Sequence, residues 1–349
     1  MSLLSLSNEL LYCILESLES ERDINALAQV SRRLYRLLNT CLYCFNIRYS
    51  GCSALLWAAQ EGQIATARKL LDETDDDQVS SDQFRISLCV AAANGHAEIV
   101  ELLLDKGVDV NAQSIAVDDG DVEYNSTFAL EAASERGHEH IVTLLLNRGA
   151  NINAQSTHYF SKQEQFYASN ALCAASEEGH ERIVKQLLDN GANVNMRGGY
   201  CGTALQAAAA GGYAQISKLL LDAGVDVNAC GQYYWKWWCE FLDSNALCIA
   251  SEEGYEHIVE LLLDKGAETE MQGGQYGNAL VAASASGYEK VVELLLDKGA
   301  NINALGKEPT IDGDVYTEIS ALQAASREGH KQVVKMLVAR GATGSTMHR

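Results

Sequence analysis

Apolar residues recur in two short blocks that alternate along most of the chain. The first block reads Ala-Leu-x-x-Ala, as at residues 204–208, and the second reads Ile/Val-Val-x-x-Leu-Leu, as at 141–146. In both blocks the apolar positions lie three or four residues apart, which places them on one face of a helix. A glycine separates the two blocks and another follows the second block, where helices commonly end. The pattern therefore predicts a repeated pair of short helices.

The glycine between the two blocks returns at only two intervals, 33 and 42 residues. Its eight copies are Gly62, Gly95, Gly137, Gly179, Gly212, Gly254, Gly287 and Gly329. Two intervals that differ by nine residues indicate one unit with an optional insert. A single unit cannot bury its apolar stripe, but a stack of eight can, so we expect the units to pack against one another.

Two short motifs accompany each unit. The tails at 149–153, 191–195 and 299–303 read Gly-Ala-Asn-Ile/Val-Asn, and the turn glycine is followed by histidine in four copies. Together with the period of 33 residues, these motifs resemble the ankyrin-repeat family over about residues 51–342. The resemblance implies an all-α solenoid of about eight repeats with β-hairpin-type finger loops, which binds proteins. The family's Thr-Pro-Leu-His is altered here, because proline and histidine are missing from every copy.

The nine-residue inserts fall between the tail of one unit and the Ala-Leu of the next. They produce four long segments, at roughly 111–128, 154–170, 229–245 and 304–320. In the ankyrin family this place corresponds to the projecting hairpin finger. Insertions at loop tips cost little closure entropy, about 0.6 kcal/mol per doubling of length, so these segments can vary for binding.

The third long segment is unusually aromatic for a loop. Trp and Tyr dominate the energetic hot spots of protein interfaces, so we predict that this segment and the second one contact a target protein. The alternative is that the rings fold onto the helices as local minicores. The predicted contact residues are Tyr233, Tyr234, Trp235, Trp237, Trp238 and Phe241 in the third segment, with Tyr159 and Phe160 in the second.

Acidic residues end two of the first helices, at Glu177, Glu178, Glu252 and Glu253. The ankyrin resemblance places these positions on the concave side of the stack. They form either a groove for a basic segment of the partner or merely a solvated face.

Residues 1–48 do not follow the repeat. Leu10, Leu11, Ile14 and Leu15 share one helical face, and the simple interpretation is a helical cap over the end of the stack. The segment also resembles an F-box, with Leu6-Ser7 in place of the hallmark Leu-Pro. That resemblance implies docking onto the Skp linker subunit of a cullin-type ubiquitin ligase. The contacts implied by position are Leu6, Leu10, Leu11, Ile14 and Leu15.

Composition narrows the classes of partner. The 349 residues include 26 Lys and Arg against 47 Asp and Glu, which gives a net charge of −21, and 47% are hydrophobic. Such a chain can fold, and its surface repels phosphate, so we expect neither nucleic acid nor membrane as a partner. The N-terminus does not resemble a secretory signal. We therefore expect reduced cysteines and a cytoplasmic or nuclear location. Residues 343–349 are a short tail.

Nothing in the sequence predicts a catalytic, cofactor or metal site. Cys41 and Cys44 lack the further ligands of a structural zinc site, and Cys89, Cys173 and Cys248 follow the repeat's leucine, as small core residues would. The leading hypothesis is thus a non-enzymatic substrate receptor without cofactor or small-molecule substrate. It would tether a target protein to a cullin-type ligase. The alternative is an interaction scaffold with no ligase link.

Overall fold

The computed structural model describes residues 53–73, 82–117, 124–160, 165–199, 201–235, 240–309 and 316–344. The predicted F-box-like segment, 1–48, lies outside these ranges. The chain divides into two compact units. Unit 1 contains the described parts of Met1–Ala116 and Ser126–Asn151, and unit 2 those of Val117–Asn125 and Ile152–Arg349.

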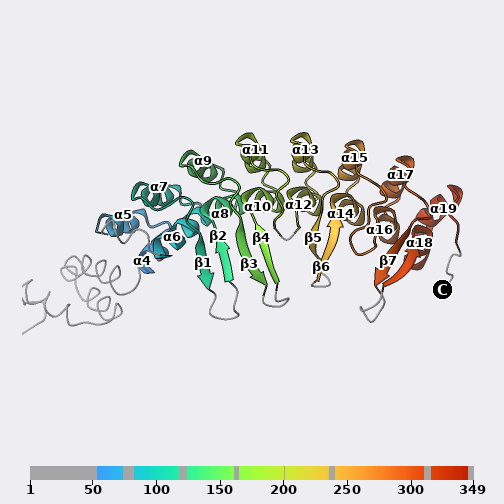
Figure 1. Cartoon of the computed structure of the whole chain (residues 1–349), viewed down its shortest axis with the longest axis horizontal. Helices are drawn as coiled ribbons and strands as arrows, with labels where there is room; N and C mark the ends of the chain where they lie inside the picture. Colours follow the sequence, from blue (N-terminus) through green and yellow to red (C-terminus); the bar gives the residue numbers. More distant parts are fainter. Residues whose placement is uncertain are drawn as a thin grey trace, which may run out of the picture. The chain divides into compact units, whose positions relative to one another are not determined.

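Unit 1 consists of three helix pairs. The first helices pack on one another in order, and so do the second helices (Figure 1). The first helices are α4 (Ser53–Glu61), α6 (Asp82–Ala93) and α8 (Ala129–Glu135), and the second are α5 (Ile64–Asp72), α7 (Ala97–Asp105) and α9 (Glu139–Asn147). Strands β1 (Ser114–Val117) and β2 (Tyr124–Thr127) are neighbours in a sheet and lie within the first long segment.

Unit 2 consists of five helix pairs with the same packing of like on like. The first helices are α10 (Ala171–Glu177), α12 (Ala204–Ala210), α14 (Ala246–Glu253), α16 (Ala279–Ser286) and α18 (Ala321–Glu328). The second helices are α11 (Glu181–Asp189), α13 (Ala214–Asp222), α15 (Glu256–Asp264), α17 (Glu289–Asp297) and α19 (Lys331–Ala339).

The other three long segments form antiparallel hairpins in unit 2, as the resemblance implied. They pair β3 (Ser156–Phe160) with β4 (Gln165–Ser169), β5 (Cys230–Trp235) with β6 (Glu240–Asn245), and β7 (Leu305–Pro309) with β8 (Tyr316–Ser320). The predicted helix pairs and fingers are therefore confirmed for the described residues.

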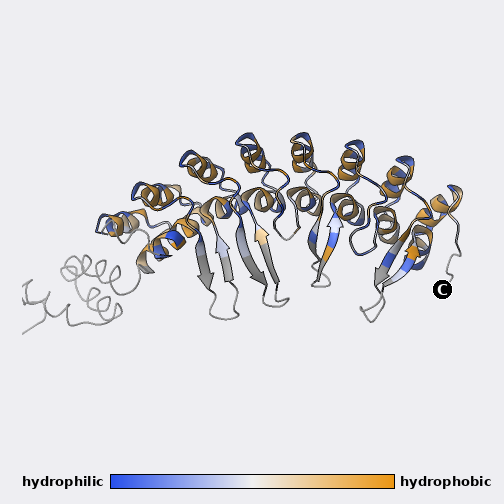
Figure 2. Cartoon of the chain, viewed as in Figure 1, coloured by the Kyte–Doolittle hydropathy of each residue, from blue (hydrophilic) through white to orange (hydrophobic). Residues whose placement is uncertain are grey.

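The two apolar blocks of each repeat form the core. Ala204 and Ala208 of α12 are fully buried, and so are Ile183, Val184 and Leu187 of α11. Figure 2 shows this as orange along the helices and blue at the turns that join them. Small alanines on the first helices leave room for neighbouring helices to approach closely, which explains their use in every repeat.

The missing Thr-Pro-Leu-His motif is replaced by simple caps. Asn170 accepts a hydrogen bond from the Cys173 amide at 3.0 Å, which satisfies a free amide at the start of α10. Asn245, Asn278, Thr203 and Ser320 cap their helices in the same way. Neighbouring tails are joined by a second set of bonds, such as the Asn193 amide to the Asn153 side chain at 2.8 Å.

Candidate protein-binding surface

The aromatic segment is a hairpin whose register is defined by the pairing of β5 with β6. Tyr233 lies opposite Leu242, Tyr234 opposite Phe241, and Trp235 opposite Glu240. Strand positions alternate between two faces, so positions 233 and 235 share the face of buried Gly231, and position 234 shares that of exposed Gln232. Trp237 and Trp238 lie outside the described residues. The side chains of Tyr233, Tyr234, Trp235, Phe241, Tyr159 and Phe160 are likewise outside the description.

A buried amide holds the base of this hairpin. Gln206 of α12 is fully buried, and its Nε2 donates to the carbonyl oxygens of Gly231 at 3.3 Å and Ser244 at 3.0 Å. One side chain therefore bonds both strands. Because a buried unpaired carbonyl is costly, these bonds fix where the hairpin leaves the helix layer.

Short turns lie between the hairpins and contact the strands on either side. The first carries Gly198-Gly199, and the Gly199 amide donates to the Ala168 carbonyl of β4 at 2.7 Å. On its other side a Cβ added to Gly202 would lie 2.9 Å from the Gly231 Cα atom of β5. Only glycine permits this approach.

The second short turn repeats the arrangement. The Gly274 amide donates to Asp243 of β6 at 2.9 Å, and the Lys307 amide of β7 donates to Tyr276 at 3.0 Å. All three hairpins of unit 2 are thus connected sideways through the intervening turns, at the described parts of their strands.

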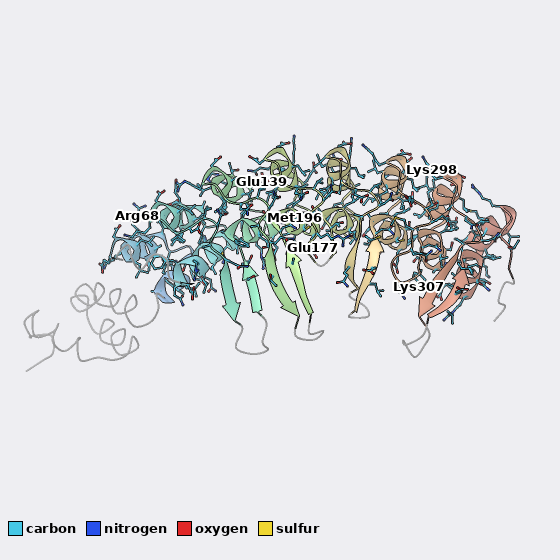
Figure 3. All side chains as sticks on the ribbon, in the orientation of Figure 1. Arg68, Glu139, Glu177, Met196, Lys298 and Lys307 are labelled. Atoms are coloured by element: carbon cyan, nitrogen blue, oxygen red, sulfur yellow. The ribbon has the colours of Figure 1, made fainter. Side chains whose placement is uncertain are left out.

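The four predicted acidic residues do not share one environment. Glu178 and Glu253 are exposed, and Glu177 is half-buried at the boundary between the helices and the hairpins (Figure 3). The Cys201 thiol donates to Glu177 Oε1 at 3.9 Å. Glu252 is buried, with 9% of its surface exposed. The two pairs come from α10 and α14, with the α12 repeat between them.

Burial changes the chemistry of Glu252. Desolvation, and then the nearby Glu253 carboxylate, raise its pKa from 4.5 to about 8. The cover comes from the second short turn, since a Cβ on Gly274 would lie 3.6 Å from Glu252 Oε2. Sequence reasoning placed Glu252 on an acidic surface, whereas in the structure it is a buried acid whose pKa is raised by desolvation.

The residue after the turn glycine carries a ring in most repeats and has a structural role. Its ring packs on the turn glycine of the preceding repeat. In unit 1 these rings are His96 and His138, whose Nε2 atoms lie 3.1 Å from the Gln60 carbonyl oxygen and 2.9 Å from that of Ala93. In unit 2 they are Tyr213, Tyr255, Tyr288 and His330. The regular replacement of histidine by tyrosine was the available signal.

Family comparison assigns this architecture. A model described as ankyrin repeats (3 copies) matches residues 28–114, 55–156, 156–230 and 236–306, and one described as ankyrin repeats (many copies) matches 280–338. The chain belongs to the ankyrin-repeat family. Ankyrin repeats are protein–protein interaction modules and in general are not enzymes.

The comparisons add nothing to the ligase hypothesis. The first ankyrin match begins at residue 28, inside the segment that resembles an F-box, and no F-box domain is detected. No curated protein matches this ankyrin-repeat chain.

The described part of the ankyrin chain holds no group of His, Cys, Asp and Glu that could bind a metal ion. Within the same ranges, no helix combines the length and apolarity needed to cross a membrane. Cys89, Cys173 and Cys248 are buried in the core, as predicted. Burial raises the pKa of the Cys89 thiol to about 11 and that of Cys248 to about 12, so both are protonated.

Proposed function

We propose that this ankyrin-repeat chain is a non-enzymatic receptor that holds a target protein on the hairpins of unit 2. The sideways connection of these hairpins through the short turns supports the proposal most directly. A partner that contacts several hairpins together would pay little entropy for aligning their strands, because the short turns already hold these strands side by side.

The aromatic hairpin is the proposed centre of the contact. Its segment contains Tyr233, Trp235, Trp237 and Trp238, residue types that bury large rigid area at an interface. Gln206 fixes its base, so the aromatic positions project from a defined place rather than from a free loop.

Substitution of the tip tests this proposal against the minicore alternative. We expect Trp237→Ala and Trp238→Ala each to weaken target binding by roughly 2–4 kcal/mol, with an unchanged melting temperature. The target is first captured with the full-length chain and identified by mass spectrometry, and its affinity is then measured by calorimetry. Trp57→Ala in unit 1 is the control. A lower melting temperature with binding intact would identify the hairpin as a minicore and refute the proposal.

We further propose that residues 1–48 tether the receptor to a cullin-type ligase through the Skp linker subunit. The support is the apolar pattern of Leu6, Leu10, Leu11, Ile14 and Leu15. Tethering would raise the local concentration of the target near the ligase. The Skp subunit should co-purify with the full chain and be lost on deletion of 1–48, while target capture persists. If the full-length chain does not co-purify with the Skp subunit, the proposed link to the ligase is wrong.

One observation favours the alternative, a scaffold whose N-terminal segment is only a cap. Trp57 of α4 is 51% exposed, whereas the equivalent Ala174 and Ala207 are 6% and 2% exposed beneath a preceding helix. Leu37-Leu38 precede the Ala-Leu of α4 by the same interval that separates Leu187-Leu188 from that of α12. Under this alternative, deletion of 1–48 should lower the melting temperature of unit 1. The full-length chain should also purify without the Skp subunit.

A further inference from the structure

The turn edge of unit 2 repeats one arrangement 75 residues apart. Glu178 precedes Gly179, and a Cβ on that glycine would lie 2.6 Å from the Tyr213 ring. Glu253 precedes Gly254, whose Cβ would lie 2.5 Å from the Tyr288 ring. Both carboxylates are exposed, and Tyr288 is 39% exposed. We name these two pairs, Glu178 with Tyr213 and Glu253 with Tyr288, the first and second seats.

A third ring lies between the seats. Tyr255 packs on Gly212, where an added Cβ would lie 2.8 Å from the ring. Burial raises the pKa of the Tyr255 phenol, and Glu253, Tyr288 and Tyr213 add to that rise. Each ring packs on the turn glycine of the preceding repeat, and Glu253 directly precedes the glycine under Tyr288, so the three rings and Glu253 follow one another along one aromatic and acidic edge.

The second seat adjoins a buried acid that lacks a partner. Glu252 is nine-tenths buried and has no hydrogen bond or ion pair to any described residue. Helices α12 and α16, which pack on α14, carry no charged residue. The titratable groups on the other packed elements, α14 itself, α15 and β6, are Cys248, Glu253, Glu256, His257, Glu260, Asp264, Glu240 and Asp243. None of them is a lysine or arginine.

We infer that this edge binds an extended basic segment of a partner protein, with one lysine or arginine in each seat. A carboxylate beside an aromatic ring suits a cation, because the ion pair and the attraction of the ring face act together. The net charge of −21 disfavours an anionic occupant. This inference rests on the proposed receptor function and specifies the chemistry of its partner.

The geometry also specifies the spacing of the two basic residues. The seats are two repeats apart, and packed helices lie about 8–10 Å from one another, so the separation is about 16–20 Å. An extended chain advances about 3.3 Å per residue, which corresponds to roughly five or six residues. An even number directs both side chains to the same face, so a separation of six is expected to fit best.

Synthetic peptides test the spacing on the full-length chain. Each labelled peptide carries two arginines separated by three, six or nine residues in an otherwise neutral sequence, and binding is followed by fluorescence anisotropy at low salt. We expect the six-residue peptide to bind tightest, and replacement of one arginine by glutamine to weaken it by about three- to fivefold. Equal affinity for all three spacings would overturn the inference.

Variants test the seats themselves. Tyr213→His with Tyr288→His uses a residue that the fold already accepts at 96, 138 and 330, and should weaken the six-residue peptide about tenfold. Glu178→Gln with Glu253→Gln should do the same. The matched control is Glu181→Gln with Glu256→Gln, which removes two exposed carboxylates that are also 75 residues apart.

The control pair should change affinity less than about twofold. If it weakens the peptide as much as the seat variants do, binding is unspecific charge attraction and the inference fails. Trp237→Ala separates the two proposals, since it should reduce target capture but leave peptide affinity unchanged. If Trp237→Ala abolishes target capture but the chain shows no preference among the three peptide spacings, the receptor function stands and the seats are rejected.

Discussion

Units 1 and 2 are built from the same helix pair but differ in the residue that follows the turn glycine, which we call the slot residue. In unit 1, His96 and His138 each approach a carbonyl of the preceding repeat at hydrogen-bond distance. In unit 2, tyrosine takes the slot in three successive repeats, and Tyr288 remains 39% exposed. The same position thus carries a histidine near a carbonyl in unit 1 and in the last repeat of unit 2, where His330 Nε2 lies 2.9 Å from the Ala285 carbonyl oxygen. In the three repeats before it, the position carries a tyrosine ring.

The units also differ two residues before the turn glycine. Unit 1 has Gln60 and Ala93 in its first two repeats, whereas unit 2 has half-buried Glu177 and buried Glu252. At this position unit 2 therefore carries acidic side chains where the first two repeats of unit 1 carry neutral ones.

The largest expected effect is the pH dependence caused by Glu252. Its folded pKa of about 8 lies above its ordinary 4.5, so its stabilisation is complete below pH 4.5 and is lost as the pH rises to 8. A unit of pKa corresponds to about 1.4 kcal/mol, so the shift from 4.5 to about 8 corresponds to roughly 5 kcal/mol over this window. Glu252→Gln, which mimics Gln60 of unit 1, should remove that loss in urea unfolding between pH 5 and 9. An unchanged pH profile, equal to that of Glu256→Gln, would contradict the assignment.

The second effect concerns the close approach of turn and hairpin in unit 2. A Cβ on Gly306 would lie 2.1 Å from the Tyr276 carbonyl oxygen, which is backbone and cannot yield. Gly306→Ala should therefore cost about 2–3 kcal/mol. Gly299→Ala is the control, because Gly299 has a φ of 91° with open space around it. It should cost about 1 kcal/mol from backbone strain alone. Equal losses in chemical unfolding would show that the contact is loose.

A reciprocal exchange tests the slot residue directly. His138→Tyr should lose the 2.9 Å contact with the Ala93 carbonyl and cost about 1 kcal/mol. Tyr255→His should gain the equivalent bond and stabilise unit 2 by up to about 1 kcal/mol. Melting curves of the two variants should shift in opposite directions. Shifts in the same direction would mean that ring size, not hydrogen bonding, distinguishes the units.

The smallest effect on stability is expected from the surface ion pairs, which both units contain. Arg148 pairs with Asp105 at 2.8 Å in unit 1, and Lys298 pairs with Asp264 at 2.6 Å in unit 2. Both pairs are solvent-accessible, so Arg148→Met and Lys298→Met should each cost about 0.2–1 kcal/mol, and less at high salt. A cost above about 2 kcal/mol at either position would require a larger network than the structure shows.

The sequence predicts the helix pairs well because their signals are local. The alanines and leucines of α12 and the Ile-Val-x-x-Leu-Leu of α9 repeat at helical spacing, and glycine marks each turn. The hairpins followed from the family resemblance rather than from strand patterns. Their bounds confirm that the nine-residue inserts extend a finger and leave the helices unchanged.

The environments of single side chains were harder to predict, because they depend on segments far along the chain. Glu252 and Glu253 are adjacent, yet only Glu252 is covered by the turn at Gly274. The rings of Tyr213 and Tyr288 pack on glycines 34 residues earlier. The sequence shows that these residues recur at equivalent positions of the repeat, but it does not show which segment packs against them.

The anchoring of the β5–β6 hairpin at its base separates attachment from recognition along a single loop. Gln206, Gly231 and Ser244 hold the stem, while the residues between Trp235 and Glu240 take no part in those bonds. New recognition sequences can therefore be grafted at the tip while the attachment stays intact. In this sense the stem of the hairpin serves for attachment, and the sequence beyond it is free to vary for recognition.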